Sequence, residues 1–133
     1  MKTAVLGTGT DAPSPPGSSP RHAPTLFVKD TDSLGEQIQR SFPAARVVKY
    51  LNTLNADLMA HPDTLPEATT VFISGNDADA KHNVTQLLKD FGHQDVIDLG
   101  DTSTARGTEM LLPVWLRLWG ALGTPAFNFK IVR

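Results

Sequence analysis

The sequence predicts a three-layer α/β fold with a mainly parallel sheet, and three observations support it. Short apolar runs at residues 47–51, 71–74 and 96–99 have the length of buried strands. Between the second and third runs, residues 78–91 are predicted to form a helix with inward positions at helical spacing, namely Ala80, Val84, Leu87, Leu88 and Phe91. Two buried strands joined by a helix of this length form a parallel βαβ unit. A chain of 133 residues can bury one core, so we expect a single domain over residues 1–133.

The composition excludes several classes of function. The chain has 12 Lys and Arg residues against 14 Asp and Glu, and no run of like charge suits a nucleic acid or an anionic membrane. It has no cysteine, so thiolate catalysis and cysteine-bound zinc are excluded. The four histidines lie in separate segments, which argues against a metal site. Because neither a signal peptide nor a membrane span is evident, we expect a cytoplasmic protein.

The N-terminal segment carries part of a dinucleotide-binding motif. An apolar run at residues 3–6 leads into the pattern G-x-G-x-x-A, formed by Gly7, Thr8, Gly9, Thr10, Asp11 and Ala12. In that motif the glycines let the backbone approach a pyrophosphate, and the next helix points its N–H groups at it. Prolines crowd residues 13–24 and exclude such a helix here. We therefore interpret residues 1–12 as a strand and glycine turn, or as a plain strand-to-loop turn, and residues 13–24 as a linker.

The C-terminal part, residues 25–133, begins with a predicted short helix. Ser33 and Glu36 fit a capping box, in which each side chain satisfies a free backbone N–H group. The predicted buried stripe of this helix consists of Leu34, Ile38 and Phe42. A second short helix is expected over residues 55–61, ahead of the central βαβ unit.

The most apolar segment of the chain, residues 110–122, is predicted to be helical. Apolar side chains occur all around its axis, so we expect this helix to be enclosed by its own domain or shared with a partner. Pro113 should kink it near Glu109. Trp115 and Trp119 lie one turn apart and either stack on a flat ligand or pack together. After the helix, residues 127–132 alternate as a terminal strand or an extended tail.

Ligands of an open parallel sheet lie beyond the carboxyl ends of its strands. Applied here, that rule selects four turns of the chain as one candidate binding edge. They are residues 7–10, 52–53, 74–76 and 100–101.

Four segments in order resemble the reductases that pass hydride between NADP and a deazaflavin coenzyme, factor 420. They are VVKYLNTLNADLM, VFISGNDADAK, VIDLGDTSTARGTEM and GALGTPAFNFKIVR. The resemblance covers residues 1–12 and 24–133 and concerns mainly the C-terminal half of that family. In the family the glycine turn belongs to a complete Rossmann domain, most of which is missing here. The resemblance thus implies a truncated Rossmann-like fold, NADP as cofactor and 8-hydroxy-5-deazaflavin as co-substrate, with activity impaired by the deletion.

The resemblance also implies roles for individual residues. Gly7, Thr8, Gly9, Thr10, Asn52 and Thr53 would bind the cofactor, the last two near the nicotinamide, and Arg106 would bind an anionic substrate tail. No catalytic side chain is expected, because the cofactors carry hydride chemistry. Two alternatives need no ligand. Asn52 could cap the following helix, and Arg106 could pair with Glu109 and tie the helix start to the loop at Asp101.

A second function comes from a different class. The chain could be a catalytically inactive α/β fragment that acts as a dimerisation or protein-interaction module. The glycine turn followed by prolines favours this alternative, whereas the C-terminal motifs favour the oxidoreductase. In either case we expect a homodimer held mainly through residues 110–122, since a large exposed apolar patch is rare on a soluble monomer. The remaining expected partners are a nucleotide or a deazaflavin, and neither nucleic acid nor membrane.

Overall fold

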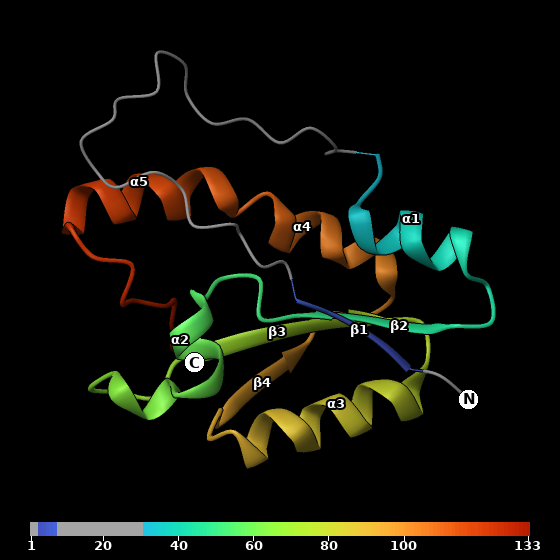
Figure 1. Cartoon of the computed structure of the whole chain (residues 1–133), viewed down its shortest axis with the longest axis horizontal. Coiled ribbons are helices and arrows are strands. Elements are labelled where there is room, and N and C mark those ends of the chain that lie inside the picture. Colours follow the sequence, from blue (N-terminus) through green and yellow to red (C-terminus); the bar gives the residue numbers. More distant parts are fainter. Residues whose placement is uncertain (1–2, 8–30) are drawn as a thin grey trace.

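The structure, a computed structural model, describes residues 3–7 and 31–133 of the chain (Figure 1). The predicted linker at residues 13–24 lies outside the described residues. The described part contains both helices and a sheet, which confirms an α/β fold.

One four-stranded sheet organises the fold. Its strands follow each other in the order β1 (Thr3–Gly7), β2 (Arg46–Tyr50), β3 (Thr70–Gly75) and β4 (Asp95–Asp98). The three runs predicted as core strands therefore do share one sheet. The sheet is mixed, however: β1 pairs with β2 and β3 with β4 in parallel, whereas β2 and β3 are antiparallel.

Helix length explains this mixture of directions. The helix between β3 and β4, α3 (Ala78–Asp90), rises about 20 Å, which matches the length of β3 and returns the chain to the opposite end of the sheet. The connection between β2 and β3 contains only α2 (Ala56–Ala60) and the 3₁₀ turn η1 (Pro62–Thr64). A helix as short as α2 rises about 8 Å, so the chain enters β3 at the same end of the sheet at which it left β2.

Helices lie on both sides of the sheet. Figure 1 shows α3 on one side and α1 (Leu34–Ser41), α4 (Ala105–Glu109) and α5 (Leu112–Leu122) on the other. The 3₁₀ turn η2 (Thr102–Thr104) leads into α4. Asp77 caps α3 by accepting a hydrogen bond from the Ala80 N–H, and Ser33 caps α1 through the Glu36 N–H, as predicted for Ser33.

The hydrophobic core lies mainly on the α3 side of the sheet. It consists of Val48, Leu51, Leu54, Leu58, Val71, Ile73, Ala80, Val84 and Leu88. The inward positions predicted for α3 are thus confirmed at Ala80, Val84 and Leu88. They are wrong at Leu87 and Phe91, which are exposed because they lie at the outer margin of the stripe and past the last helical residue.

The stripe predicted to bury α1 is wrong. Leu34 and Phe42 are both exposed, Phe42 to 63 %. The side of α1 that packs is the one with Gly35, whose backbone lies against Lys49 of β2 and Ala105 of α4. A Cβ at Gly35 would make ordinary van der Waals contacts, 3.8 Å from Ala105 and 3.9 Å from Lys49. This side of the helix is therefore packed, whereas Leu34 and Phe42 remain accessible.

The helix predicted over residues 110–122 corresponds to α5, and a separate helix, α4, precedes it. α4 ends at Glu109 and α5 starts at Leu112, with Pro113 in its first turn, where a missing N–H costs little. Pro113 therefore starts a new helix, a stronger effect than the predicted kink. Of the α5 side chains only Trp115 is buried, whereas Val114 and Leu122 are exposed, so the fold does not enclose this helix.

The C-terminal residues form an extended tail with no regular strand. The Phe129 carbonyl accepts a hydrogen bond from the Thr70 N–H at 2.9 Å, and the Ile131 N–H donates to the Thr70 hydroxyl at 2.9 Å. The tail is therefore fixed at the beginning of β3. Within the described ranges, no helix has the length and apolarity needed to cross a membrane.

Candidate cofactor-binding site

The antiparallel pairing divides the predicted binding edge into two. Gly7 pairs with Tyr50, so β1 and β2 end side by side, next to Asn52 and Thr53. Gly75 at the end of β3 pairs with Val48, and β4 runs parallel to β3. The turns at residues 74–76 and 100–101 therefore lie at the opposite edge, which corrects the expectation of a single edge.

A strained residue marks the edge where β1 and β2 end. Leu51 directly follows β2 and has φ 53°, the one positive φ among the described non-glycine residues. Such a left-handed conformation costs on the order of 1–3 kcal/mol, and residues of this kind cluster at functional sites. Buried packing of the Leu51 side chain in the core holds it there. The strain turns the chain out of the sheet so that Asn52 and Thr53 follow at the edge.

Asn52 connects this edge to α4. Its side-chain amide donates a hydrogen bond to the Thr108 carbonyl. The cap of α2 is Asn55, whose side-chain oxygen accepts from the Leu58 N–H at 3.0 Å. The alternative in which Asn52 caps that helix is therefore wrong.

Thr53 holds the C-terminal tail. It is buried, and its hydroxyl donates to the Asn128 side-chain oxygen at 2.6 Å. Asn128 in turn donates to the Thr69 hydroxyl at 2.8 Å and to the Thr70 carbonyl at 3.0 Å. This chain of hydrogen bonds closes one side of the edge, so the observed contribution of Thr53 is to fix the tail.

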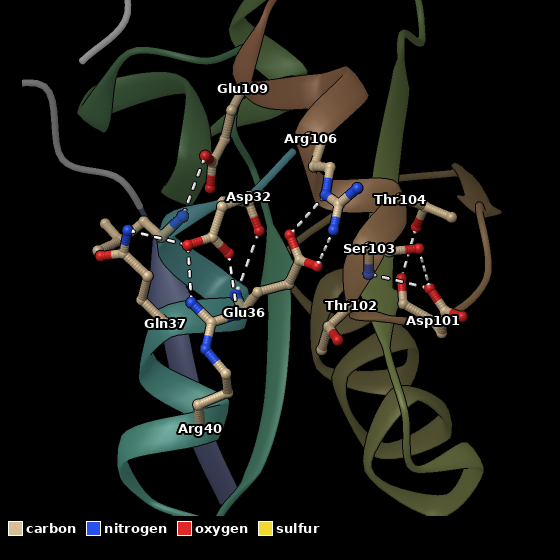
Figure 2. Close-up of polar contacts among 12 residues, drawn as sticks. Asp32, Glu36, Gln37, Arg40, Asp101, Thr102, Ser103, Thr104, Arg106 and Glu109 are labelled. Atoms are coloured by element: carbon tan, nitrogen blue, oxygen red, sulfur yellow. Dashed lines mark hydrogen bonds and ion pairs between the residues drawn. The ribbon is translucent and has the colours of Figure 1, made fainter. Parts of the chain in front are cut away.

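Arg106 forms a different ion pair from the predicted one. Its guanidinium donates to both carboxylate oxygens of Glu36, at 2.8 and 2.6 Å, and Figure 2 shows the two side chains meeting between α4 and α1. This partner replaces Glu109, because Glu109 points elsewhere. The bidentate contact lowers the pKa of Glu36. The ion pair thus ties α4 to α1, whereas Asp101 caps η2 through the Ser103 N–H.

A buried ion pair between Lys49 and Glu109 was not predicted. Lys49 is 2 % exposed, and its Nζ lies 3.3 Å from Oε1 of Glu109. Neither of these two atoms has a hydrogen bond within the described part of the chain, so the attraction is between charges. Burial lowers the pKa of Lys49, and Glu109 opposes this. The sequence could have indicated this ion pair through the lysine inside the strand R-V-V-K-Y, because a buried lysine needs a partner of opposite charge.

The face of the sheet toward α1 and α4 is consequently polar. Besides Lys49, it carries Ser74, whose hydroxyl accepts a hydrogen bond from Thr104 at 2.7 Å. The two faces of the sheet therefore differ, with the apolar core under α3 and a charged layer under α4.

The opposite edge of the sheet uses its own polar groups. Asn76 accepts hydrogen bonds from both the N–H and the hydroxyl of Thr102, at 3.1 and 3.2 Å. An open pocket of about 460 Å³ lies beside it. The Asp77 carboxylate already caps α3 there and pairs with Arg46 at 3.3 Å, so an anion would meet negative charge at this helix end. We therefore place the candidate site at the edge formed by β1 and β2.

The aromatic pair on α5 belongs to the packing. The Trp115 and Trp119 rings meet edge to face with centroids 5.5 Å apart, and Trp115 also contacts Phe127 at 5.3 Å. Within the described ranges, no group of three or more His, Cys, Asp or Glu side chains could hold a metal ion.

Comparisons with known proteins bear on the family of the chain. No family model matches it, and no curated protein matches it. A crystal structure at 1.70 Å resolution from Arthrobacter sp. FB24, described as a "putative F420 dependent NADP-reductase", is 68 % identical over 83 % of this chain, with a TM-score of 0.81. The chain is a relative of this reductase. The recognition made from the four sequence segments is thereby confirmed.

This chain spans 50 % of the length of the Arthrobacter protein. For the nicotinamide end of a cofactor, the described residues offer Asn52, half-buried beside the end of β1. Asn52, Thr53 and Arg106 all have partners in the described part of the chain, namely Thr108, Asn128 and Glu36. Thr8, Gly9 and Thr10, which would face the pyrophosphate, lie outside the described residues. Of the residues expected to bind a cofactor, the structure therefore brings Gly7, Asn52 and Thr53 together where β1 and β2 end.

Proposed function

We propose that this chain binds NADP(H) at the edge where β1 and β2 end and takes part in hydride transfer between NADPH and an F420-type deazaflavin. The observation that carries the proposal is the 68 % identity to a structure described as an F420-dependent NADP reductase. The proposed cofactor contacts are Gly7, Thr8, Gly9, Thr10, Asn52 and Thr53. Arg106 is proposed to contact an anionic tail of the deazaflavin, sharing its charge with Glu36.

The chemistry makes few demands on the side chains of this edge. NADPH supplies a hydride, and the protein has to bind two rings face to face and exclude water between them. In this role Asn52 orients the nicotinamide carboxamide, and Thr53 with Asn128 fixes the wall of the site. The strained turn at Leu51 sets the direction in which Asn52 leaves the sheet. No general acid or base is needed from the protein.

Affinity for NADPH should be weak. By the sequence, the prolines after Thr10 are unfavourable for the helix whose N-terminus would face the pyrophosphate. The field of such a helix is worth about 0.3–1 kcal/mol per interaction and up to about 2. Lost contacts to the 2′-phosphate would remove about 1.5–3 kcal/mol each. We expect binding at least two orders of magnitude weaker than that of an intact relative.

The test is calorimetric titration of the purified chain with NADPH, with Asn52→Ala as the variant. The Arthrobacter protein is the positive control for binding and for loss of F420 absorbance on reduction. Binding that weakens in the variant supports the proposal. An absence of NADPH binding by the unmutated chain at millimolar concentration contradicts it, and sub-micromolar binding shows that the missing contacts are compensated.

A second candidate is an α/β fragment whose role is dimerisation or protein contact. The observation that favours it is the row of exposed apolar side chains on the α1, α4 and α5 side, namely Leu34, Phe42, Met110, Val114 and Leu122. A chain that dimerises but binds no NADPH would establish this alternative. A monomer that binds NADPH would exclude it.

A further inference from the structure

We propose that Lys49 and Glu109 are positioning residues that hold Asn52 in place for the nicotinamide, acting through the backbone of α4. This inference rests on the proposed function for the cofactor but has its own structural basis. Lys49 and Asn52 lie on one segment of the chain, across the end of β2. Their two partners, Glu109 and Thr108, are neighbours in α4.

The first step of the argument is that α4 cannot hold its own position. It has five residues and no side-chain cap at its N-terminus. A helix this short is not stable in isolation, so tertiary contacts must fix it. Among these are the ion pair from Arg106 to Glu36 and the contacts of Glu109.

The second step concerns how the two contacts are joined. Nζ of Lys49 lies 3.3 Å from Oε1 of Glu109, while Oε2 of Glu109 accepts a hydrogen bond from the Leu34 N–H at 3.2 Å. The carbonyl that accepts the Asn52 amide belongs to Thr108, in the peptide unit that directly precedes Glu109. Because a peptide unit is planar and rigid, a shift of Glu109 moves the acceptor of Asn52 with it.

The third step is that burial makes the ion pair stiff. The Lys49 ammonium is screened from water and has Glu109 as its described charge partner, 3.3 Å away. Separating buried opposite charges leaves each without solvation, so the pair tolerates little displacement. The Arg106–Glu36 pair is more exposed at Arg106 and is joined to Thr108 less directly. The buried pair therefore sets the distance between β2 and α4 at which Asn52 reaches Thr108.

The primary test measures hydrogen exchange of the Asn52 side-chain amide by NMR, which requires no cofactor. Glu109→Gln keeps an acceptor for Leu34 and removes the charge. We expect the Asn52 amide protons to exchange about tenfold faster in this variant. The matched control, Glu67→Gln, makes the same chemical change in an exposed ion pair with Lys130 and should leave the exchange unchanged. Unchanged exchange in a folded Glu109→Gln variant overturns the inference.

The second test is a double-mutant cycle on NADPH affinity. If Glu109 acts through Asn52, then Glu109→Gln and Asn52→Ala each weaken binding, and their combination weakens it no further than Asn52→Ala alone. Additive losses overturn the inference. Should Glu109→Gln not fold, Lys49→Met with Glu109→Gln leaves no unpaired buried charge and is put through the same two measurements with the same expected results. If the unmutated chain binds no NADPH, the proposed function is wrong, and the exchange experiment alone decides this inference.

Discussion

At the scale of a single residue, Leu51 contributes both to the stability of the fold and to the geometry of the candidate site. Its left-handed backbone is unfavourable for leucine, yet its side chain is part of the hydrophobic core. No periodicity in the sequence indicates such a residue, because a positive φ leaves no trace when the residue is not glycine. Asn52 was singled out from the sequence, but its partner in α4 could not be, since the two lie far apart along the chain.

We predict that Leu51→Gly is at least as stable as Leu51→Ala. Both variants lose a buried side chain, a loss of about 2–5 kcal/mol. Glycine normally costs about 0.5–1 kcal/mol more than alanine, but here it also relieves about 1–2 kcal/mol of left-handed strain. Urea unfolding of the two variants measures the difference.

The control for this prediction is the same pair of substitutions at Val48. Val48 is buried in β2 and has no positive φ. At Val48 the glycine variant should be less stable than the alanine variant by about 0.5–1 kcal/mol. If Leu51→Gly is also less stable than Leu51→Ala by that margin, the left-handed geometry stores no strain.

Glu36 should make the folded state sensitive to acid. Because Arg106 lowers its pKa in the folded protein, Glu36 contributes stability above its unfolded pKa of about 4.3, and this contribution is lost as the pH falls through the lower folded value. Two charge-assisted bonds to a guanidinium that is one-third exposed are worth about 1–2 kcal/mol in total. Glu36→Gln should therefore destabilise the protein by about that amount at pH 7 and by progressively less as the pH falls.

Urea unfolding midpoints measured between pH 3 and 7 show how the stability of each variant depends on pH. Glu67→Gln is the control, because Glu67 is 74 % exposed and lies 3.7 Å from Lys130. Its curve should follow that of the unmutated chain. Parallel curves for Glu36→Gln and the unmutated chain would show that the ion pair adds no pH-dependent stability.

At the scale of elements, the length of each connecting helix determined whether the direction of the next strand could be predicted. The strong periodicity of residues 78–91 identified α3 and its parallel strands, because a long helix spans the sheet. The antiparallel direction of β3 does not follow from the apolar runs alone, because it depends on α2, which is too short to carry the chain back across the sheet. The stripe of α1 was wrong for a different reason: an apolar pattern shows which side could be buried, whereas the packed side, with Gly35, follows from contacts to β2 and α4 that lie far away in the sequence. The apolar pattern itself does not indicate whether those side chains contact a partner.

The cap of α3 gives a prediction at this scale. Asp77→Ala should cost about 1 kcal/mol, because the Ala80 N–H loses its acceptor at 2.8 Å. Asp77→Asn should retain most of the stability, since asparagine is an equally good cap. The small remaining loss, a few tenths of a kcal/mol, would report the ion pair with Arg46. Equal losses in urea unfolding for both variants would show that the cap contributes nothing.

At the scale of the whole molecule, helices cover both faces of the sheet, but the layers beneath them differ. The α3 side carries the continuous apolar core, whereas α1, α4 and α5 rest on a polar layer and present apolar side chains outward. The similarity to the Arthrobacter protein and the C-terminal elements could be predicted because they depend on local motifs. The division of the binding edge could not, because it depends on how β2 and β3 pair across the sheet.

The outward apolar surface leads to the last prediction, a homodimer held mainly through residues 110–122. Met110 and Val114 are one turn apart, and Leu122 at the end of α5 is 57 % exposed. Full burial of such a side chain stabilises by about 1.5–3 kcal/mol, so three from each of two copies suffice for a lasting contact. Val114→Glu with Leu122→Glu should give a monomer in light scattering at micromolar concentration.

The choice of these two positions follows from the packing. Trp119→Glu would be a poorer test, because Trp119 contacts the buried Trp115 and its loss would damage the fold itself. Leu87→Glu on α3 is the matched control: Leu87 is exposed to a similar degree as Val114 but lies on the other side of the sheet, so this variant should remain a dimer. A monomer mass for the unmutated chain would rule the dimer out. If only Leu87→Glu dissociates the dimer, the dimer contact lies on the α3 side.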